Sequence, residues 1–198
     1  SGEHGACADE GEGRQPRRCG EESFGSGSSH IREKDGIWAI LFWLSIIAAT
    51  GKSVAEITRE NWKKYGRSYY MRFDFEGLET DVADKLMADL ENKLPALAGQ
   101  KFGAYEVSEA APFVYNDPVD GSVTKNGLVI DFTNGSKITY RLSGTGSSGA
   151  TLRVYLERPE YQDLEEDTLT MLKDLLKIAM DVAEITKRTG KTKADVNT

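Results

Sequence analysis

A glycine-rich segment constrains the fold of this chain more than any other feature. Residues 141–153 read Arg-Leu-Ser-Gly-Thr-Gly-Ser-Ser-Gly-Ala-Thr-Leu-Arg, and a strand is predicted on each side. After the glycines, Leu152, Val154 and Leu156 alternate with polar residues, which is typical of a half-buried strand. A dinucleotide site is therefore excluded, because its G-x-G-x-x-G run opens a helix. A Walker phosphate loop is excluded because no Gly-Lys-Ser/Thr follows.

From composition alone, this segment is either the flexible turn of a hairpin or a cradle for a phosphate. Glycines allow several backbone N–H groups to converge on one anion. The segment adds four hydroxyl donors, which are Ser143, Thr145, Ser147 and Ser148. Arg141 and Arg153 place a permanently charged guanidinium at each end. Because the formal net charge of the chain is −7, such a site is a basic island, and no nucleic-acid binding is expected.

Strands and helices are both predicted in the C-terminal two thirds of the chain, from about Arg67 onward. Strands are expected at residues 69–75, 101–107, 128–132, 136–141 and 152–156. Asn134-Gly135 is a strong hairpin signal. One helix is expected between Thr80, as its cap, and Pro95, and a second over residues 161–188, which Gly190 ends. The unit is long enough to bury its own core.

Residues 37–49 are apolar except for Ser45, which predicts a helix that is hydrophobic on all sides, capped by Asp35 and ended by Gly51. At about 20 Å it is too short to cross a bilayer, so no membrane partner is expected. The preceding residues offer little to bury it, so we expect self-association through this helix. Its exposed apolar face is predicted around Ile40, Phe42, Trp43 and Ile47. Ser53 and Glu56 form a capping box for a second helix, which ends near Tyr65.

The N-terminal residues bear on the cellular compartment of the protein. Residues 1–18 are polar and without periodicity, and we expect them to be disordered. They contain no signal peptide. Cys7 and Cys19 are the only cysteines, which argues against a disulfide framework and favours the cytoplasm. Two histidines are too few for a metal cluster, so no metal site is predicted.

A turn-rich loop over residues 19–30 carries adjacent carboxylates at Glu21 and Glu22. Paired carboxylates serve acid–base catalysis or metal binding. They serve equally as acceptors for sugar hydroxyls, because an ionised carboxylate only accepts hydrogen bonds. The residues alone leave these alternatives open.

Four motifs, in order and with similar spacing, resemble the glucose-preferring phosphoglucomutases of the α-D-phosphohexomutase family. They occupy residues 19–25, 30–36, 117–122 and 141–147, and the resemblance runs from Cys19 to the C-terminus. It implies an α+β, TATA-binding-protein-like C-terminal domain, in which helices pack on one face of an antiparallel sheet, preceded by a remnant of an α/β domain. The divisions it implies are an unmatched tail (1–18), a third-domain remnant (19–52), a connecting helix (53–66) and a phosphate-binding domain (67–198). Lys125-Asn126-Gly127 is one residue shorter than in the family, and a turn is expected there.

The resemblance also assigns roles to residues. It implies that Glu21 and Ser23 bind the hydroxyls of the sugar and that Lys34 helps to hold the phosphosugar. The implied phosphate-binding set is Arg141, Ser143, Gly144, Thr145, Ser147 and Arg153. Each assignment has a structural alternative: loop capping for Glu21 and Ser23, a solvated Lys34, and a pair between Arg153 and Glu157.

The family interconverts glucose 1-phosphate and glucose 6-phosphate through glucose 1,6-bisphosphate, using a phosphoserine and Mg²⁺ held by an Asp-x-Asp-x-Asp loop. Neither loop is matched in this sequence. No catalytic residue and no bound cofactor are therefore expected, and the chain alone is predicted to be inactive. The alternative is a non-catalytic relative that acts through protein contacts. The intact phosphate loop favours the enzyme family.

Overall fold

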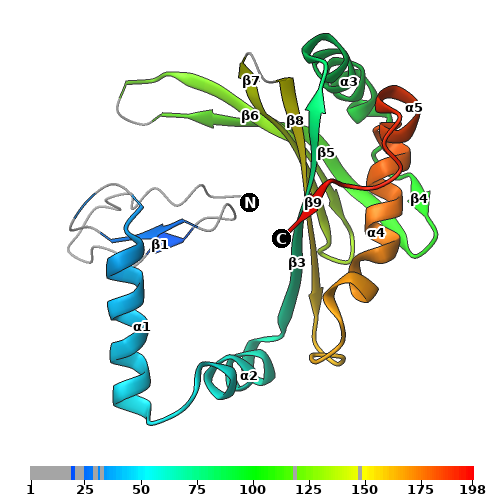
Figure 1. Cartoon of the computed structure of the whole chain (residues 1–198). Coiled ribbons are helices and arrows are strands. Elements are labelled where there is room, and N and C mark those ends of the chain that lie inside the picture. The colour runs from blue at the N-terminus through cyan, green and yellow to red at the C-terminus, as the bar shows by residue number, and fades with distance from the viewer. Residues whose placement is uncertain (1–18, 21–24, 29–30, 32–33, 118–119, 147–148) are drawn as a thin grey trace. The chain divides into compact units, whose positions relative to one another are not determined.

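The computed structural model describes all residues except 1–18, 21–24, 29–30, 32–33, 118–119 and 147–148. The chain divides into two compact units, residues 1–61 and residues 62–198 (Figure 1). The predicted disorder of residues 1–18 falls outside the described residues.

The first unit contains a short hairpin followed by helices. Strands β1 (Cys19–Gly20) and β2 (Ser26–Gly27) pair antiparallel, and α1 (Gly36–Thr50) and α2 (Val54–Tyr65) follow. The predicted cap of α1 is confirmed, because the Asp35 carboxylate accepts from the Trp38 N–H at 2.9 Å. Gly51 ends α1 in the left-handed region, with a φ of 67°. The capping box of α2 is also confirmed: the Ser53 N–H donates to Glu56 at 2.8 Å, and hydrogen bonds from Ser53 lower the Glu56 pKa.

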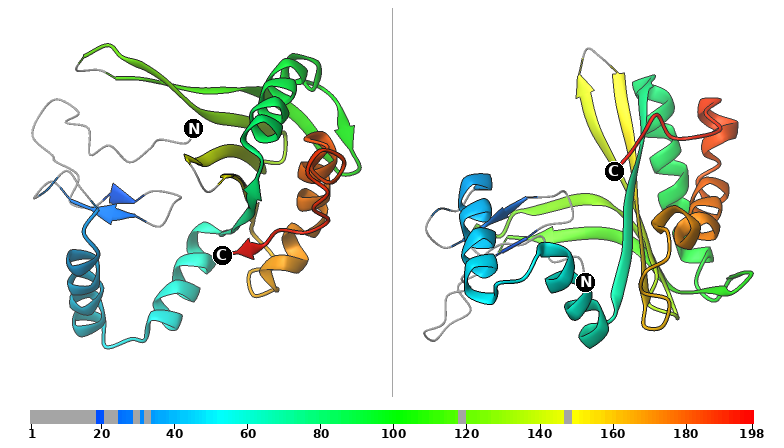
Figure 2. Two further views of the ribbon diagram at one scale, coloured as in Figure 1. Left: turned by 45° about the horizontal axis from the view of Figure 1, so that its top comes forward. Right: turned by 60° about the horizontal axis from the view of Figure 1, so that its bottom comes forward.

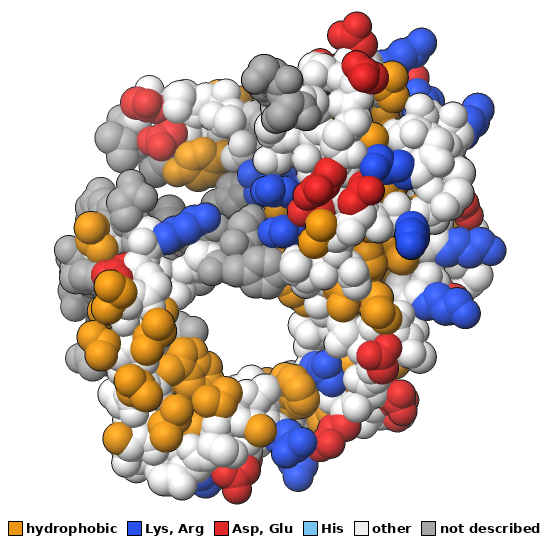
Figure 3. Space-filling view, in the orientation of Figure 1, with side chains coloured by type: hydrophobic (Ala, Val, Ile, Leu, Met, Phe, Trp, Pro, Cys, Tyr) orange, Lys and Arg blue, Asp and Glu red, His pale blue; other side chains and the backbone are white. Residues whose placement is uncertain are grey.

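Helix α1 buries none of its residues. Figure 3 shows hydrophobic side chains along it, and four of them expose more than half of their surface: Ile37, Ile40, Leu41 and Leu44. The predicted apolar face is exposed at Ile40, whereas Phe42, Trp43 and Ile47 are half-buried. Among the described helices, none alone has the length and hydropathy to cross a membrane. Helices α1 and α2 have the required length and hydropathy only when they are taken together, and the two helices are bent by 83° relative to each other.

The second unit is built on a seven-stranded antiparallel sheet. Its strands are β3 (Arg67–Leu78), β4 (Lys101–Phe102), β5 (Tyr105–Asn116), β6 (Val123–Phe132), β7 (Lys137–Gly146), β8 (Gly149–Glu160) and β9 (Val196–Asn197). They lie in the order β4-β5-β6-β7-β8-β3-β9. One face is covered by α3 (Thr80–Lys93), α4 (Thr168–Val182) and α5 (Ile185–Thr189), as Figures 1 and 2 show. A 3₁₀ turn, Leu94–Ala96, follows α3. The predicted α+β fold is confirmed.

The core lies between the sheet and these helices. Alternate residues of the strands point into it, as predicted for the 69–75 strand, where Tyr69, Phe73 and Phe75 are buried. The helices contribute Ala83, Leu86, Leu90, Leu172, Leu175, Ala179 and Val182. The opposite face of the sheet consequently carries the polar residues of the same strands.

Two predicted helices differ in their bounds. Thr80 does not cap α3: it is the first helical residue, and Glu79 precedes it without a side-chain hydrogen bond. The expected helix over residues 161–188 begins only at Thr168, because the Asp167 carboxylate caps it through the Thr170 N–H at 2.8 Å. It is then interrupted between α4 and α5 at Glu184, which has a φ of 51°.

Two strand predictions also need correction. The expected strand over residues 101–107 turns at Gly103, with a φ of 61°, and forms the β4–β5 hairpin. The expected turn at Lys125-Asn126-Gly127 lies inside β6. There Gly127 faces Phe113 and Lys125 faces Val114, so Asn126 is the extra residue of a β-bulge. In each case local composition was overridden by the pairing of neighbouring strands.

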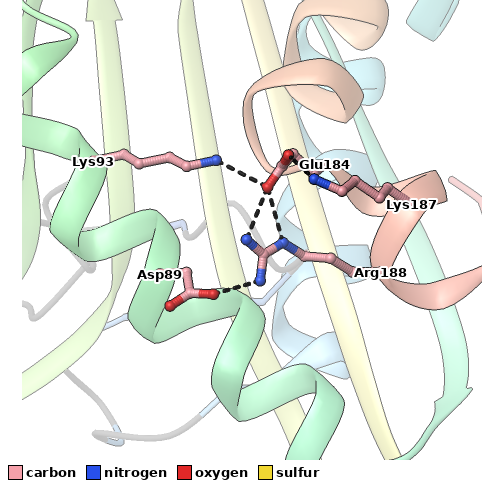
Figure 4. Close-up of polar contacts among 5 residues, drawn as sticks. All are labelled: Asp89, Lys93, Glu184, Lys187 and Arg188. Carbon is pink, nitrogen blue, oxygen red and sulfur yellow. Dashed lines mark hydrogen bonds and ion pairs between the residues drawn. The ribbon is translucent and has the colours of Figure 1, made fainter.

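An ion-pair cluster holds the break between α4 and α5 against α3 (Figure 4). The Glu184 carboxylate accepts from Lys187 at 2.8 Å, from Arg188 at 2.8 Å and from Lys93 of α3 at 3.0 Å. Arg188 also donates to Asp89 of α3 at 2.6 Å. These donors, with Lys187 first, lower the pKa of Glu184 to about 2, so the cluster is ionised at neutral pH.

Candidate phosphate-binding site

The glycine-rich segment forms the tip of the β7–β8 hairpin, as the strand on each side predicted. Gly146 pairs with Gly149, which leaves only residues 147–148 between the strands, and these two are not described. Gly144 and Gly149 adopt left-handed φ values of 68° and 88°, which favour glycine. Gly149 also approaches β3 closely, because a Cβ there would lie 3.0 Å from the Leu78 carbonyl oxygen.

A row of charged residues crosses three adjacent strands beside this hairpin tip. Asp74 on β3 pairs with Arg153 on β8, and Arg153 pairs with Arg141 on β7. Their sequence neighbours, such as Phe73 and Val154, are buried against the helices, so the three charged side chains emerge on the opposite face. The strand register thus brings together two arginines that lie twelve positions apart in the sequence.

Arg153 and Asp74 form an ion pair that involves only the Nε side of the Arg153 guanidinium. The Arg153 Nε lies 3.7 Å from the Asp74 Oδ2, which is close enough for electrostatic attraction but too long for a hydrogen bond. The same Nε is buried and has no hydrogen-bond partner among the described residues. The Asp74 Oδ1 accepts a hydrogen bond from Arg72 Nε at 2.9 Å. Asp74 is only 4% exposed, so one buried carboxylate serves two arginines.

Arg141 stands opposite Arg153 without an acidic partner of its own. Within the described part of the chain, no hydrogen bond or ion pair engages the half-buried Arg141 side chain. Like charges directly opposite each other on neighbouring strands repel. A pair of guanidinium groups in this arrangement is stabilised when an anion binds between them, and both groups match the oxygen atoms of a phosphate.

The remaining predicted phosphate ligands follow from the same register. Ser143 lies two residues beyond Arg141, on the same face of β7, and pairs with Thr151. Gly144 is exposed at the start of the hairpin tip. Thr145 lies in β7, but its side chain is outside the described part, as is all of Ser147. The structure therefore brings together Arg141, Ser143, Gly144 and Arg153.

Of the predicted sugar-binding residues, Glu21 and Ser23 lie outside the described residues. Lys34 is described, and the stem of its side chain crosses Gly25, the last residue of the motif over residues 19–25. A Cβ on Gly25 would lie 2.6–2.9 Å from three of the Lys34 side-chain carbons. The Asp35 N–H also donates to the Ser26 carbonyl at 2.8 Å. Lys34 is therefore held beside the predicted sugar loop.

The alternative partner proposed for Arg153 is wrong. Glu157 accepts from the Ser68 hydroxyl at 2.6 Å, and the acid that meets Arg153 is Asp74. The alternation of β3 had placed Arg72 and Asp74 on a polar face. The sequence alone did not reveal the order of the strands, in which β3 lies beside β8.

The described residues contain no metal site. No three His, Cys, Asp or Glu side chains among them are grouped closely enough to hold an ion. The carboxylate at the site, Asp74, is instead engaged by Arg72 and Arg153.

Comparison with known proteins identifies the family of the chain. The family model for the C-terminal domain of phosphoglucomutase-1 matches residues 67–195, and the model for the alpha/beta/alpha domain III of phosphoglucomutase/phosphomannomutase matches residues 12–65. Phosphoglucomutase-1 of Homo sapiens is 48% identical over 91% of this chain and 34% of its own length, and phosphoglucomutase of Rhizobium radiobacter gives the same values.

A crystal structure of the Paramecium phosphoglucomutase pp63/parafusin, in its open form, superposes with a TM-score of 0.79 at 43% identity. The match covers 92% of this chain and 32% of that one. The chain thus spans about a third of the length of the relatives that it matches. Because the C-terminal domain model covers more than half of its residues, the chain belongs to the phosphoglucomutase family.

Proposed function

We propose that this chain carries the phosphosugar-binding part of a phosphoglucomutase, an enzyme that interconverts glucose 1-phosphate and glucose 6-phosphate through glucose 1,6-bisphosphate. The observation that carries the proposal is the pair of facing arginines, Arg141 and Arg153, at the base of a glycine-rich hairpin. A phosphate monoester has up to two negative charges and three acceptor oxygens, which suits two guanidinium groups together with hydroxyl and N–H donors. The ligand proposed for the site is the phosphate group that is not being transferred.

The proposed roles follow the sequence prediction. Arg141 and Arg153 supply charge, Ser143, Thr145 and Ser147 supply hydroxyl donors, and Gly144 supplies a backbone N–H. In the first unit, Glu21 and Ser23 bind sugar hydroxyls, and Lys34 contacts the phosphosugar. The position of Lys34 over Gly25 supports its assignment to the sugar loop. We assign residues 19–52 to the sugar-binding domain, residues 53–66 to a connecting helix and residues 67–198 to the phosphate-binding domain.

Removing one of the two arginines should abolish most of the phosphate affinity. We expect Arg153→Ala to weaken binding of glucose 6-phosphate by about 10- to 100-fold, because a charge-assisted hydrogen bond contributes about 1.5–3 kcal/mol. Titration followed by ¹⁵N NMR should show shifts of the residue 143–149 amides that saturate in the wild type and need about 10- to 100-fold more ligand in Arg153→Ala.

Lys137→Ala is the matched control for this titration. It also removes one positive charge from β7, four residues from Arg141 and on the same face of the sheet, where Lys137 lies 3.7 Å from Asp131. It should leave the affinity within about twofold of wild type. A wild-type chain without saturable shifts, or equal losses in Arg153→Ala and Lys137→Ala, would contradict a built phosphate site.

The 198-residue chain should not catalyse the mutase reaction by itself. It matches neither the family's phosphoserine loop nor its metal loop, and its described residues offer no ligand set for Mg²⁺, so no metal-dependent step is assigned to them. Binding groups position a phosphosugar but do not supply a phosphoryl donor. A coupled assay with glucose 1-phosphate, glucose 1,6-bisphosphate and Mg²⁺ should give the background rate. Turnover that Arg153→Ala removes would contradict this prediction, whereas turnover that it leaves unchanged identifies a contaminating enzyme.

The compartment stays a prediction. Cytoplasmic location was expected from the cysteine content, but two relatives, from Marchantia polymorpha and Solanum tuberosum, are named as chloroplastic forms at 45% and 44% identity. No observation favours the alternative of a non-catalytic relative.

A further inference from the structure

The buried acid beside the candidate site, Asp74, contacts two arginines, and both contacts are made at the same atom of the arginine side chain, Nε. Asp74 meets both of its arginines at Nε: Oδ1 binds Arg72 Nε at 2.9 Å, and Oδ2 lies 3.7 Å from Arg153 Nε. Nε is the inner edge of the guanidinium fork, so an arginine held there has two terminal amino groups that this contact does not use. Those two groups form the end-on edge of the guanidinium, which can bind two oxygens of a phosphate.

We propose that Asp74 is a positioning residue of the phosphate site, which holds the Nε edge of Arg153 so that its terminal amino groups face the bound phosphate. The inference rests on the proposed function of the hairpin. It adds a residue on β3, 79 positions away from Arg153, to a site that the sequence places entirely within residues 141–153.

Electrostatics alone argues in the opposite direction, which makes the proposal testable. An acid beside an anion site lowers the positive potential, so charge counting predicts that its removal tightens phosphate binding. The geometry predicts the reverse. Arg153 faces Arg141 across the strand pair, its Nε has no hydrogen-bond partner, and Asp74 is its only ion-pair contact among the described residues. Without Asp74, repulsion between the arginines turns Arg153 away, and its ordering must then be provided by the ligand.

Asp74→Asn tests the proposal with little change in shape, because asparagine has the same size and its oxygen still accepts from Arg72. We expect affinity for inorganic phosphate to fall about tenfold, which corresponds to about 1.4 kcal/mol. The matched control is Asp131→Asn on the same face of the sheet. Asp131 lies 3.7 Å from Lys137, the same separation as between Asp74 and Arg153. Its removal should leave the affinity unchanged or slightly increase it.

A double-variant comparison identifies Arg153 as the group through which Asp74 acts. In an Arg153→Lys background the charge is kept but the Nε edge is absent. There Asp74→Asn should lower phosphate affinity by no more than about twofold. A tenfold loss in both backgrounds would overturn the proposal, as would unchanged or tighter binding by Asp74→Asn alone.

Side-chain NMR separates this inference from the proposed function. The Arg153 Nε–H resonance of the ligand-free wild type should be sharp and should broaden or shift in Asp74→Asn, but not in Asp131→Asn. If this holds and the wild type binds no phosphate, Asp74 does order the Arg153 side chain, but the proposed function is wrong. If the wild type binds phosphate and Asp74→Asn binds it equally, the function stands and the positioning role is wrong.

Should Asp74→Asn fail to fold, Asp74→Glu replaces it, because the added methylene moves the carboxylate relative to Arg153. A loss of phosphate affinity of at least threefold is expected for it. Wild-type affinity in Asp74→Glu would overturn the proposal.

Discussion

A chain that lacks residues 1–52 should fold, remain monomeric and be more soluble than the full chain. The core cluster lies entirely between Tyr69 and Ile185, so the deletion removes none of it. It does remove α1, whose apolar side chains are exposed and which buries no residue. Exposed apolar surface of this kind drives self-association, which we propose for the full chain. Size-exclusion chromatography with light scattering, over a range of concentrations, should show association only in the full chain.

A substitution within α1 serves as the control for the deletion. Ile40 and Leu44 lie one turn apart on the helix and are 62% and 54% exposed. Replacing both with glutamate in the full chain should reproduce the gain in solubility without shortening the chain. Thermal unfolding of residues 53–198 should occur within about 5 °C of the full chain, roughly the shift expected for 1 kcal/mol. Loss of the cooperative transition would show that the second unit needs the first.

Gly127→Ala should destabilise the second unit by about 3 kcal/mol and weaken phosphate binding with it. Gly127 has a φ of 142°, and a Cβ there would lie 2.5 Å from the Tyr140 carbonyl oxygen and 2.8 Å from Arg141 Cγ. The backbone conformation alone costs a non-glycine residue about 1–3 kcal/mol, and the collision with a backbone carbonyl adds to it. Relief of the second contact moves the stem of Arg141 out of the charged row. Urea unfolding measures the first effect, and phosphate titration measures the second.

Gly103→Ala serves as a control that separates the steric clash of the added Cβ from the free-energy cost of the backbone conformation. Gly103 has a φ of 61° in the β4–β5 turn, and nothing lies within 4 Å of a Cβ placed on it. It should cost only about 1 kcal/mol and leave phosphate affinity unchanged. If both alanines cost the same, Gly127 is required for its backbone angle and not for the space that it leaves for Arg141.

Local signals in the sequence predicted most of the elements correctly where a single residue decides the geometry. Gly51 and Gly190 end helices in left-handed conformations, and Ser53 with Glu56 opens α2, because these effects act within one turn. Two errors concerned local helix caps, at Thr80 and Asp167, and the others occurred where distant contacts decide. Glu184, at the break between α4 and α5, accepts a hydrogen bond from Lys93, which lies 91 residues away, and the bulge at Asn126 belongs to the pairing of β6 with β5.

The same distinction applies to the candidate site. Its anion-binding character followed from composition, because glycines, hydroxyls and two arginines occur within thirteen residues. The opposition of Arg141 to Arg153 depends on a register shift between Ser143 and Gly146, which the composition of the segment does not predict. Asp74 was missed because no local rule predicts that β3 and β8 are neighbours. The one local signal was a charged residue at an alternating position of a strand.

The charged row also ties ligand binding to the folding of the whole second unit. Asp74, Arg153 and Arg141 come from three neighbouring strands, and the contact between the first two joins residues 79 positions apart. Contacts of such sequence separation form only when the loop between them has closed, and their closure limits the folding rate of sheets. An anion that needs the complete row therefore binds the native state and not the unfolded chain. By mass action, a higher concentration of the anion then raises the free energy of unfolding.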